Sequence, residues 1–379
     1  MKVLHLPYTV GGNPQGISKH LNLLGVNSQT WTLYQNYLSF AADKVIFSSK
    51  DRVIIREIKR LWALRYIFIF DTVFFNFGTS LYEPFVIPNE QSLSRLFLFG
   101  LKMHQAYVSF MQKIELTLLT LLNRKVFIQY QGDDARQGDY CLSHFEISPA
   151  QKVEAGYYTA EKDALKRKQI ETLTHLARKT YALNPDLLHV LPKGSEFLPY
   201  SHISLEDWAP NYTQLEMRPL RFGHAPTHRG VKGTDLILEA VENLHNAGYD
   251  FEFVLIEGLS NQEAKKKYAS IDVLIDQLYA GWYGGLAVEV MALGKPVLVY
   301  IREDDLGFIP EQMRKDMPFI QAKPNTIQDA MKQVLEMPRA ELVTLARQSR
   351  AYVERWHDPV EIAKRIKSDL DAAANEARK

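Results

Sequence analysis

Two basic residues just before a predicted helix are the most chemically informative feature of the chain. A predicted strand ends at Pro226, Arg229 and Lys232 follow in a glycine-containing loop, and a helix opens with Thr234 as its N-cap. Side-chain cations and backbone N–H donors at a helix N-terminus together neutralise a diphosphate. The sequence therefore predicts a diphosphate site at this position. The alternative is that both cations are ordinary solvated surface residues.

A second strand–turn–helix segment, about fifty residues later, could complete such a site. An aromatic and glycine turn over 279–285 precedes a helix that is predicted to begin near Leu286 and to carry Glu289 in its first turn. The amides of Gly285–Ala287 could bind another side of a phosphate, and the Glu289 carboxylate could accept two hydrogen bonds from a ribose cis-diol. Alternatively, Glu289 only stabilises the helix dipole, a contribution of about 0.3–1 kcal/mol.

The first loop of the chain is rich in glycine. It runs over Gly11–Gly16, between a predicted strand and a helix from Ile17. Gly12 and its neighbours would let the backbone approach a phosphate or a sugar closely. The spacing is not G-x-G-x-x-G, and no acidic residue ends the next strand at Tyr34, so a dinucleotide-dependent dehydrogenase is disfavoured. A tight turn without a ligand is the alternative.

The elements that position these residues are short apolar runs that alternate with helical patterns. Continuous hydrophobicity predicts parallel strands covered on both faces, and the alternation predicts α/β doubly wound domains. A polar stretch, Ser201–Arg218, separates two series of strands and is the predicted domain junction. The predicted strands are Lys2–Thr9, Thr30–Tyr34, Lys44–Ser48, Asp71–Gly78, Lys125–Tyr130, Thr180–Asn184 and Glu196–Tyr200, then Leu220–Pro226, Phe251–Glu257, Asp272–Leu278, Pro296–Ile301 and Pro318–Ala322.

Composition excludes several classes of protein. The 379 residues carry 45 Lys and Arg against 44 Asp and Glu, a net charge of +1, which disfavours a general nucleic-acid binder. Cys141 is the only cysteine, so an intrachain disulfide and a cysteine-based zinc site are excluded, and a reducing compartment is favoured. Residues 1–200 carry 23 − 17 = +6, and residues 201–379 carry 22 − 27 = −5. The basic half is predicted to face an anionic surface, unless the two halves merely attract each other or the split is chance.

One long segment allows two interpretations. Residues Gln91–Leu122 are apolar around most of a helix, with a narrow polar stripe through Lys102 and Gln105. Packing into the first domain is favoured. The alternative is that the helix presents its apolar side chains to a membrane, with basic segments such as Arg52–Arg65 and Lys162–Lys168 supplying an anionic-lipid surface. No apolar run is long enough for a transmembrane helix, and no targeting segment is recognised.

The segments around these motifs together resemble a known family. His224–Asp235 and Gly281–Val297 are most similar to the retaining, nucleotide-sugar-dependent glycosyltransferases of family four, and Phe74–Gly78, Gln129–Arg136 and Leu183–Leu188 extend the resemblance over nearly the whole chain. The resemblance implies a GT-B fold, in which two Rossmann-like doubly wound lobes face a cleft. The implied ranges are an acceptor lobe over 1–205, a nucleotide-sugar lobe over 206–355, and a helix over 356–379 that returns to the first lobe.

The resemblance also implies roles for individual residues. Arg229 and Lys232 would hold the donor diphosphate, and Glu289 would hold the ribose. The sugar and phosphate would be lined by the first glycine loop and the aromatic-glycine turn, and these further donor-binding residues are Gly12, Tyr283, Gly284, Gly285, Leu286 and Ala287.

The first lobe contributes the expected catalytic residues. The loop Gln131–Arg136 ends a predicted strand and, by the same resemblance, borders the donor sugar and the acceptor. Asp133 or Asp134 would accept the proton of the acceptor, and Arg136 would fix an anionic acceptor group. The alternative is that Asp134 and Arg136 form a local structural ion pair.

The sequence departs from the family pattern at one position. The family commonly has a second glutamate eight residues before the one at Glu289, and Gly281 stands there. This departure puts in doubt how the sugar hydroxyls are bound, and Trp282 and Tyr283 are candidates to compensate. No Asp-x-Asp motif follows a strand, so a metal-dependent transferase is disfavoured and no metal ion is expected. No cofactor is expected either, with the nucleoside diphosphate sugar as co-substrate.

The expected function is transfer of a sugar, with retention, from a nucleoside diphosphate sugar to a glycan or lipid-linked acceptor, in surface polysaccharide or glycoconjugate synthesis. The expected location is the cytoplasm, with peripheral contact to the inner face of the membrane through the first lobe. One alternative is a nucleotide-sugar epimerase of the same fold. The other is an inactive protein that binds a nucleotide sugar or a partner.

Overall fold

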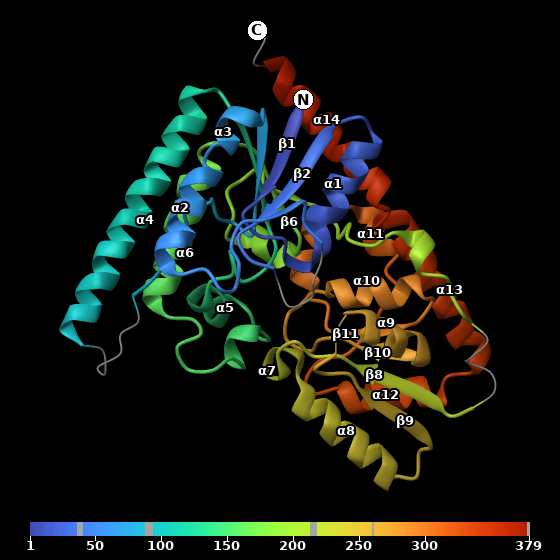
Figure 1. The fold of residues 1–379 in the computed structure, drawn as a ribbon. Coiled ribbons are helices and arrows are strands. Elements are labelled where there is room, and N and C mark those ends of the chain that lie inside the picture. Colours follow the sequence, from blue (N-terminus) through green and yellow to red (C-terminus); the bar gives the residue numbers. More distant parts are fainter. Residues whose placement is uncertain (36–40, 88–93, 213–217, 260, 377–379) are drawn as a thin grey trace. The chain divides into compact units, whose positions relative to one another are not determined.

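The chain forms two compact units and passes between them several times. Unit 1 contains Met1–Asp139, Tyr158–Leu198 and Val360–Lys379, and unit 2 contains Tyr140–Tyr157 and Pro199–Pro359. Residues 140–157 therefore group with unit 2, although they precede the expected junction by more than forty residues. The structure is a computed structural model (Figure 1) that describes residues 1–35, 41–87, 94–212, 218–259 and 261–376, so part of the junction, 213–217, lies outside the described residues.

Unit 1 is built on a seven-stranded sheet of parallel strands, in the order β3-β2-β1-β4-β5-β6-β7. The chain moves outward from β1 to β3 and then returns to the other side of β1 with β4, which places a topological switch point between β1 and β4. The strands are β1 (Lys2–Leu6), β2 (Asn27–Thr32), β3 (Lys44–Val45), β4 (Thr72–Asn76), β5 (Lys125–Tyr130), β6 (Ala177–Ala182) and β7 (Glu196–Phe197).

Helices of unit 1 connect these strands, as parallel strands require. The longest begins at Arg95, and residues 91–93 of the expected long helix lie outside the described residues. The helices are α1 (Asn13–Leu23), α2 (Val53–Ala63), α3 (Tyr66–Ile69), α4 (Arg95–Leu121), α5 (Gly138–His144, which passes into unit 2), α6 (Ala160–Thr174) and α14 (Pro359–Glu376).

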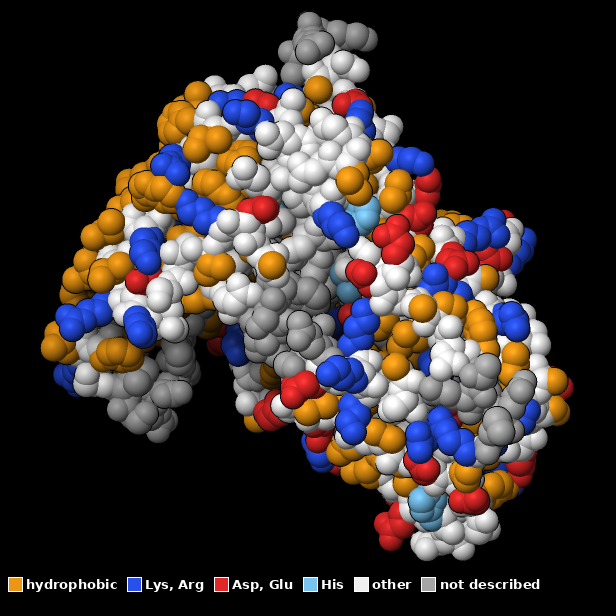
Figure 2. Space-filling model, turned by 45° about the vertical axis from the view of Figure 1, so that its right-hand side comes forward, with side chains coloured by type: hydrophobic (Ala, Val, Ile, Leu, Met, Phe, Trp, Pro, Cys, Tyr) orange, Lys and Arg blue, Asp and Glu red, His pale blue; other side chains and the backbone are white. Residues whose placement is uncertain are grey.

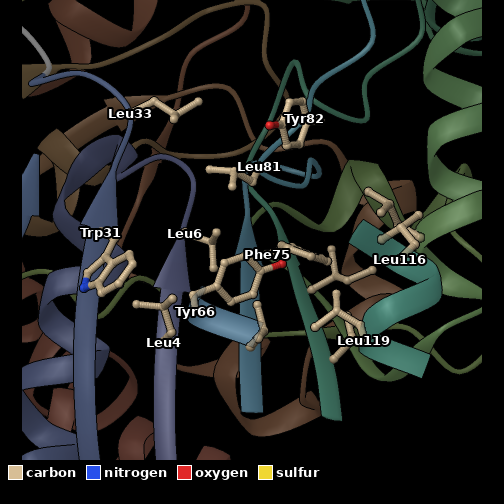
Figure 3. Close-up of a cluster of buried hydrophobic side chains, with 14 of the residues drawn as sticks. Leu4, Leu6, Trp31, Leu33, Tyr66, Phe75, Leu81, Tyr82, Leu116 and Leu119 are labelled. Carbon is tan, nitrogen blue, oxygen red and sulfur yellow. The ribbon is translucent and has the colours of Figure 1, made fainter. Parts of the chain in front are cut away.

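Both faces of the first sheet are buried, which explains the continuous hydrophobicity of its strands. Val3 and Phe74 point to the face that α1 and α14 cover. Their neighbours Leu4 and Phe75 point to the opposite face and pack with residues of α3, α4 and α6, as Figure 3 shows for part of this cluster. The second half of α4 is packed as expected, whereas most of its first half is exposed.

Unit 2 has a five-stranded parallel sheet in the order β12-β11-β10-β8-β9. The strands are β8 (Leu220–His224), β9 (Phe251–Leu255), β10 (Val273–Ile275), β11 (Val297–Val299) and β12 (Ile320–Gln321). The helices are α7 (Arg229–Lys232), α8 (Thr234–Asn246), α9 (Asn261–Ser270), α10 (Gly285–Ala292), α11 (Glu311–Lys315), α12 (Ile327–Glu336) and α13 (Arg339–Trp356).

The core of unit 2 forms where α8, α12 and α13 pack on the sheet. Phe222 of β8 lies in one cluster with Ile237, Met331 and Leu342 of these three helices. Every predicted strand overlaps a strand of the structure, and the predicted class of two α/β doubly wound lobes is confirmed. Among the described helices, none combines the length and the hydrophobicity that crossing a bilayer requires.

Candidate functional site

A buried ion pair lies at the switch point of the sheet in unit 2. The switch point falls between β8 and β10, because β9 pairs with one side of β8 and β10 with the other. The segments after these strands meet there: Nζ of Lys232 lies 2.6 Å from Oδ1 of Asp276, and Oδ2 of Asp276 accepts a hydrogen bond from the Gly284 N–H at 2.7 Å. A fixed ammonium group and the start of α10 are thus brought together at the carboxyl edge of the sheet.

The segment that carries Lys232 is more ordered than the sequence indicates. Arg229 and Lys232 lie on the short helix α7, not in an open loop. The predicted N-cap, Thr234, is instead the first residue of α8, because Gly233 adopts a left-handed conformation (φ 77°) and occupies the cap. A Cβ atom at position 233 would come within 2.8 Å of the Leu278 side chain, so the tight turn requires glycine here.

A neutral histidine stabilises the same region through two hydrogen bonds. His224 Nδ1 lies 2.8 Å from the Ile275 carbonyl oxygen, and Nε2 lies 2.9 Å from Oγ1 of Thr234. Burial lowers the pKa of His224 to about 4, so the ring is uncharged near neutral pH. It joins the ends of β8 and β10 to the start of α8, which is a structural role. His228 is different: it caps α7 by accepting a hydrogen bond from the Val231 N–H.

Arg229 is placed differently from Lys232. Its guanidinium forms two hydrogen bonds to the Glu257 carboxylate, at 2.9 and 2.7 Å, and its side chain is 52% exposed. The role of Arg229 in holding a diphosphate stays a prediction, and an incoming phosphate would compete with Glu257 for it. Glu257 was not among the site residues predicted from the sequence. Its position just after β9, at the same edge of the sheet, was the signal that could have identified it.

The N-terminus of α10 begins one residue earlier than expected, at Gly285, with Gly284 as its N-cap. The Gly284 amide is bonded to Asp276, and the Ala287 amide donates to the Gly284 carbonyl at 3.0 Å. The amides of Gly285 and Leu286 lie in the first turn, where no helical carbonyl precedes them. These two N–H groups are the ones that this helix could offer to a phosphate.

Glu289 forms a pair with a histidine that sequence reasoning missed. Glu289 is the fifth residue of α10, so the prediction that it lies in the first turn is wrong. Because the effect of the helix dipole falls off beyond the first turn, the dipole stabilises an acid less at this position. Its Oε1 lies 3.2 Å from Nε2 of His202, and both side chains are largely buried. A Cβ atom at Gly285 would lie 3.2 Å from the same ring. His202 falls in the expected domain junction, so no local pattern pointed to it.

Tyr283, a predicted donor-binding residue, lies in the interior of unit 2. Its ring stacks against Trp282 and Phe319, with centroid distances of 4.5 and 4.6 Å. Its hydroxyl lies 3.1 Å from that of Tyr352 and 2.9 Å from Nε2 of His357. Burial raises the pKa of Tyr283 well above its ordinary value. Its donor-binding role stays a prediction, while its visible contacts are those of a core residue.

The departure from the family pattern at Gly281 has a structural reason. Gly281 is left-handed (φ 77°), and a Cβ atom there would come within 2.7 Å of the Arg302 guanidinium. Arg302 is buried, hydrogen-bonded to Asp305 at 2.9 Å, and stacked 3.7 Å from the ring centroid of Phe145. A buried cation from the segment after β11 therefore occupies the space that a side chain at position 281 would need.

In unit 1, Gly12 lies at the carboxyl end of β1, beside the switch point of its own sheet. Both Gly11 and Gly12 are left-handed, with φ of 59° and 73°, and Gly12 is the N-cap of α1. The turn brings the backbone directly into the helix, as the glycines predict. The donor-binding role of Gly12 stays a prediction.

The loop after β5 holds the three predicted catalytic residues. Arg136 pairs with Asp133 at 3.1 Å and with Asp186 at 2.8 Å. The alternative interpretation, a local Asp134–Arg136 ion pair, is therefore wrong. Arg136 is held in place by two acids, so any anionic acceptor group would have to compete with them.

Asp134 closes the turn of this loop. Its carboxylate accepts hydrogen bonds from the Gln131 N–H at 2.9 Å and the Gly132 N–H at 2.6 Å. Burial raises the pKa of Asp134 to about 6, partly opposed by these bonds. Asp133 instead accepts a hydrogen bond from the Tyr158 hydroxyl at 2.6 Å, and 37% of its side chain is exposed. The catalytic roles of Asp133, Asp134 and Arg136 stay predictions.

Two further observations concern ligand binding. Within the described ranges, no group of three or more His, Cys, Asp and Glu side chains could hold a metal ion. A groove of about 1350 Å³ lies in unit 1, where residues of α4 and α6 line it, including Lys102, Lys113 and Lys168. Its lining includes none of the residues predicted for the donor.

Comparison with known proteins supports the fold. No protein-family model matches the chain, and no curated protein sequence matches it. Among solved structures, it is similar to sucrose-phosphate synthase from Thermosynechococcus elongatus (TM-score 0.60, 12% identity, 100% of each chain covered). It is also similar to HepE from Anabaena in complex with UDP-glucose (TM-score 0.58, 11% identity, 98% of this chain and 100% of that chain). A third is the UDP-GlcNAc 2-epimerase from Neisseria meningitidis bound to UDP-GlcNAc (TM-score 0.50, 15% identity, 98% and 99%). The two parallel α/β sheets and these similarities together show that the chain has the GT-B fold.

Proposed function

We propose that the protein is a glycosyltransferase that moves a sugar from a nucleoside diphosphate sugar to a glycan or lipid-linked acceptor, with retention at the anomeric carbon. The pathway proposed is surface polysaccharide or glycoconjugate synthesis. The observation that carries the proposal is the Lys232–Asp276–Gly284 arrangement at the switch point of unit 2. Similar structures were solved with UDP-glucose and UDP-GlcNAc, which supports a nucleotide sugar as the donor.

The chemistry proposed for this arrangement is stabilisation of the leaving group. Lys232 and the amides of Gly285 and Leu286 would neutralise the diphosphate as its bond to the sugar breaks, because fixed donors at a developing charge need no reorganisation. Glu289 would accept hydrogen bonds from the ribose hydroxyls, with His202 holding the carboxylate in place. Neither step requires a metal ion.

The acceptor side of the proposal rests on unit 1. Asp133 would orient the acceptor hydroxyl or receive its proton, and Arg136 would bind an anionic group of the acceptor. Asp134 would hold the loop in shape through its bonds to the backbone. Retention would follow if the acceptor attacks from the side of the leaving group and its proton passes to a phosphate oxygen. We also propose that the protein works in the cytoplasm, at the inner face of a membrane.

Calorimetric titration with UDP, GDP and ADP tests the donor site. Lys232 should be replaced together with its partner, as Lys232→Met with Asp276→Asn, so that no buried charge is left unpaired. Loss of a charged hydrogen bond predicts affinity about ten- to a hundredfold weaker for the nucleotide that binds best. Lys332→Ala, which removes an exposed ion pair with Glu336 in the same unit, is the control. Equal affinity in wild type and double variant would refute the proposal.

The epimerase remains a second candidate, because the chain is similar over nearly its whole length to a UDP-GlcNAc 2-epimerase. The two reactions differ in their products. An epimerase converts the donor into an isomer without any acceptor, whereas a transferase releases the free nucleoside diphosphate and forms a new glycosidic bond. NMR of the nucleotide sugar after incubation with the protein alone separates them: a new isomer would favour the epimerase. For a transferase, the anomeric coupling constant of the product then reports retention or inversion.

A further inference from the structure

Exposed hydrophobic side chains are concentrated on three helices of unit 1. Of the 24 large hydrophobic residues that are exposed in the described part of the chain, 15 fall within residues 53–69 and 95–122. Figure 2 shows hydrophobic side chains gathered on the flank that carries α2, α3 and α4, with Lys and Arg among them. We call this surface the apolar flank. Its residues are Val53, Ile54, Ile55, Ile58, Leu61, Trp62, Phe68, Ile69, Leu96, Phe97, Phe99, Met103, Phe110, Leu121 and Leu122.

The spacing of these residues makes a continuous surface on each helix. On α2, Ile54, Ile58 and Leu61 are four and three residues apart, so they share one face. On α4, Met103 and Phe110 lie two helical turns apart on one stripe. The helices are neighbours, because Oε1 of Glu57 on the inner side of α2 lies 3.8 Å from Nε2 of His104 on α4.

The most exposed charged residues of this flank, Arg65, Arg95, Lys102 and Lys113, are all basic. Residues 53–69 and 95–122 contain two acids, and neither faces outward as a free charge: Glu57 is paired with Arg60 at 3.0 Å, and Glu115 is buried and accepts the Tyr66 hydroxyl at 2.7 Å. The same ranges contain seven basic residues, of which Arg60 is the partner of Glu57 and Lys59 is paired with Asp51 at 2.6 Å. These are Arg56, Lys59, Arg60, Arg65, Arg95, Lys102 and Lys113.

The basic residues border the apolar stripe rather than interrupt it. Arg95, Lys102 and Lys113 are seven and eleven residues apart, which places them in a line along one side of α4. Trp62, at the end of α2, is half-exposed between two cations, with Lys44 at 3.3 Å and Arg65 at 3.4 Å from its ring centroid. An apolar surface edged by an amphipathic aromatic and by cations with long alkyl stems matches the layers of a bilayer interface.

We propose that the apolar flank lies in the interface of an anionic lipid bilayer, with α2 and α4 in the membrane plane. Their apolar faces would be buried between the acyl chains, and the bordering cations would contact lipid phosphates. A second copy of the chain fits less well, because a twofold interface would set the same positive charges against each other. The inference specifies the surface and the lipid charge, and it does not rest on the transferase reaction.

Vesicle flotation of the full chain tests the proposal, with vesicles of phosphatidylcholine alone and with 30% phosphatidylglycerol, at low and high salt. Wild type should float with the anionic vesicles, and binding should weaken at high salt. The double variant Ile58→Asp with Phe110→Asp places a charge on each helix at side chains that are 60% and 62% exposed, so folding should be unaffected. We expect at least a tenfold loss of partitioning. Leu23→Asp, at a residue of α1 that is 71% exposed, is the matched control and should bind as wild type does.

A second variant separates charge from hydrophobicity. Lys102→Glu with Lys113→Glu leaves the apolar stripe intact and should weaken binding to anionic vesicles without changing binding to neutral ones. Absence of wild-type flotation at low salt, or equal flotation of the Ile58/Phe110 variant, would overturn the proposal. So would a dimer in sedimentation that the same variant dissociates while vesicle binding is absent. No nucleotide is present, so failure here would leave the donor-site test unaffected.

Discussion

The ammonium nitrogen of Lys232 lies 2.6 Å from a carboxylate oxygen of Asp276, and the other oxygen of Asp276 holds the amide at the start of α10. One buried acid therefore fixes both groups that we assign to the diphosphate. The acid does not touch the ligand in this proposal. It sets the position of a cation and of a helix end, so that both are in place before a phosphate arrives.

Replacement of Asp276 should be more damaging than replacement of the pair. Asp276→Asn leaves the Lys232 ammonium in a buried site without its counter-charge, and breaking a buried pair in this way costs about 3–5 kcal/mol. Urea denaturation of the single variant should show this loss in the free energy of unfolding. The double variant with Lys232→Met should recover most of it. Equal stability of wild type and Asp276→Asn would show that the pair is not desolvated.

Gly281→Ala should destabilise the protein more than the same change at another left-handed glycine. Gly248 has φ 87° with nothing within 4 Å of an added Cβ atom, so Gly248→Ala measures the conformational cost alone, about 1–2 kcal/mol. At Gly281 the Cβ atom would also meet the Arg302 guanidinium at 2.7 Å, which adds about 1–3 kcal/mol. Thermal unfolding of the two variants side by side gives the difference. Identical melting temperatures would mean that Arg302 moves aside freely.

Tyr283→Phe distinguishes a core residue from a donor-binding residue. The variant keeps the stacked ring but removes the hydroxyl that contacts Tyr352 and His357, and buried partners left unsatisfied cost about 1–3 kcal/mol. We expect a lower melting temperature and an unchanged affinity for the nucleoside diphosphate. The opposite pattern, with unchanged stability and weaker nucleotide binding, would support a donor-binding role for Tyr283.

The titration of Asp134 should appear as a pH dependence of stability. Its pKa is about 6 in the folded chain, above the ordinary value of an aspartate, so the folded state binds the proton more tightly than the unfolded state does. The stabilising contribution is complete below about pH 4 and is lost as the pH rises through 6. Relative to Asp134→Asn, wild type should lose up to about 3 kcal/mol between pH 4 and pH 7. Urea denaturation at each pH measures this difference, and a constant difference would contradict it.

The sequence predicts the elements of this fold better than the contacts between them. Strands such as Lys125–Tyr130 are found as predicted, because burial on both faces leaves a run of apolar residues that is visible locally. The end of β8 and the start of α10 are likewise within a residue or two of their predicted positions. Periodicity and glycine placement are local properties, and these features depend on nothing else.

The side chains that contact the predicted site residues could not be predicted from local sequence patterns. His202 reaches Glu289 from 87 positions away, and Arg302 fills the space beside Gly281 from a different strand end. Asp276 lies in a predicted strand, Asp272–Leu278, but its double role depends on the order in which β8 and β10 pair. Such contacts are set by sheet topology, which a single sequence does not encode locally.

The helix α14 has a consequence for the order in which the chain can fold. Ile362, Ile366 and Leu370 are buried against β1, β4, β5 and β6, so the part of this face that α1 does not cover stays exposed until these residues are present. During synthesis, more than 150 residues of unit 2 leave the ribosome between β7 and this helix. While the second unit emerges, the amino-terminal sheet therefore exposes an apolar surface to solvent or to a chaperone. A helix that follows unit 2 in the sequence therefore completes the first unit.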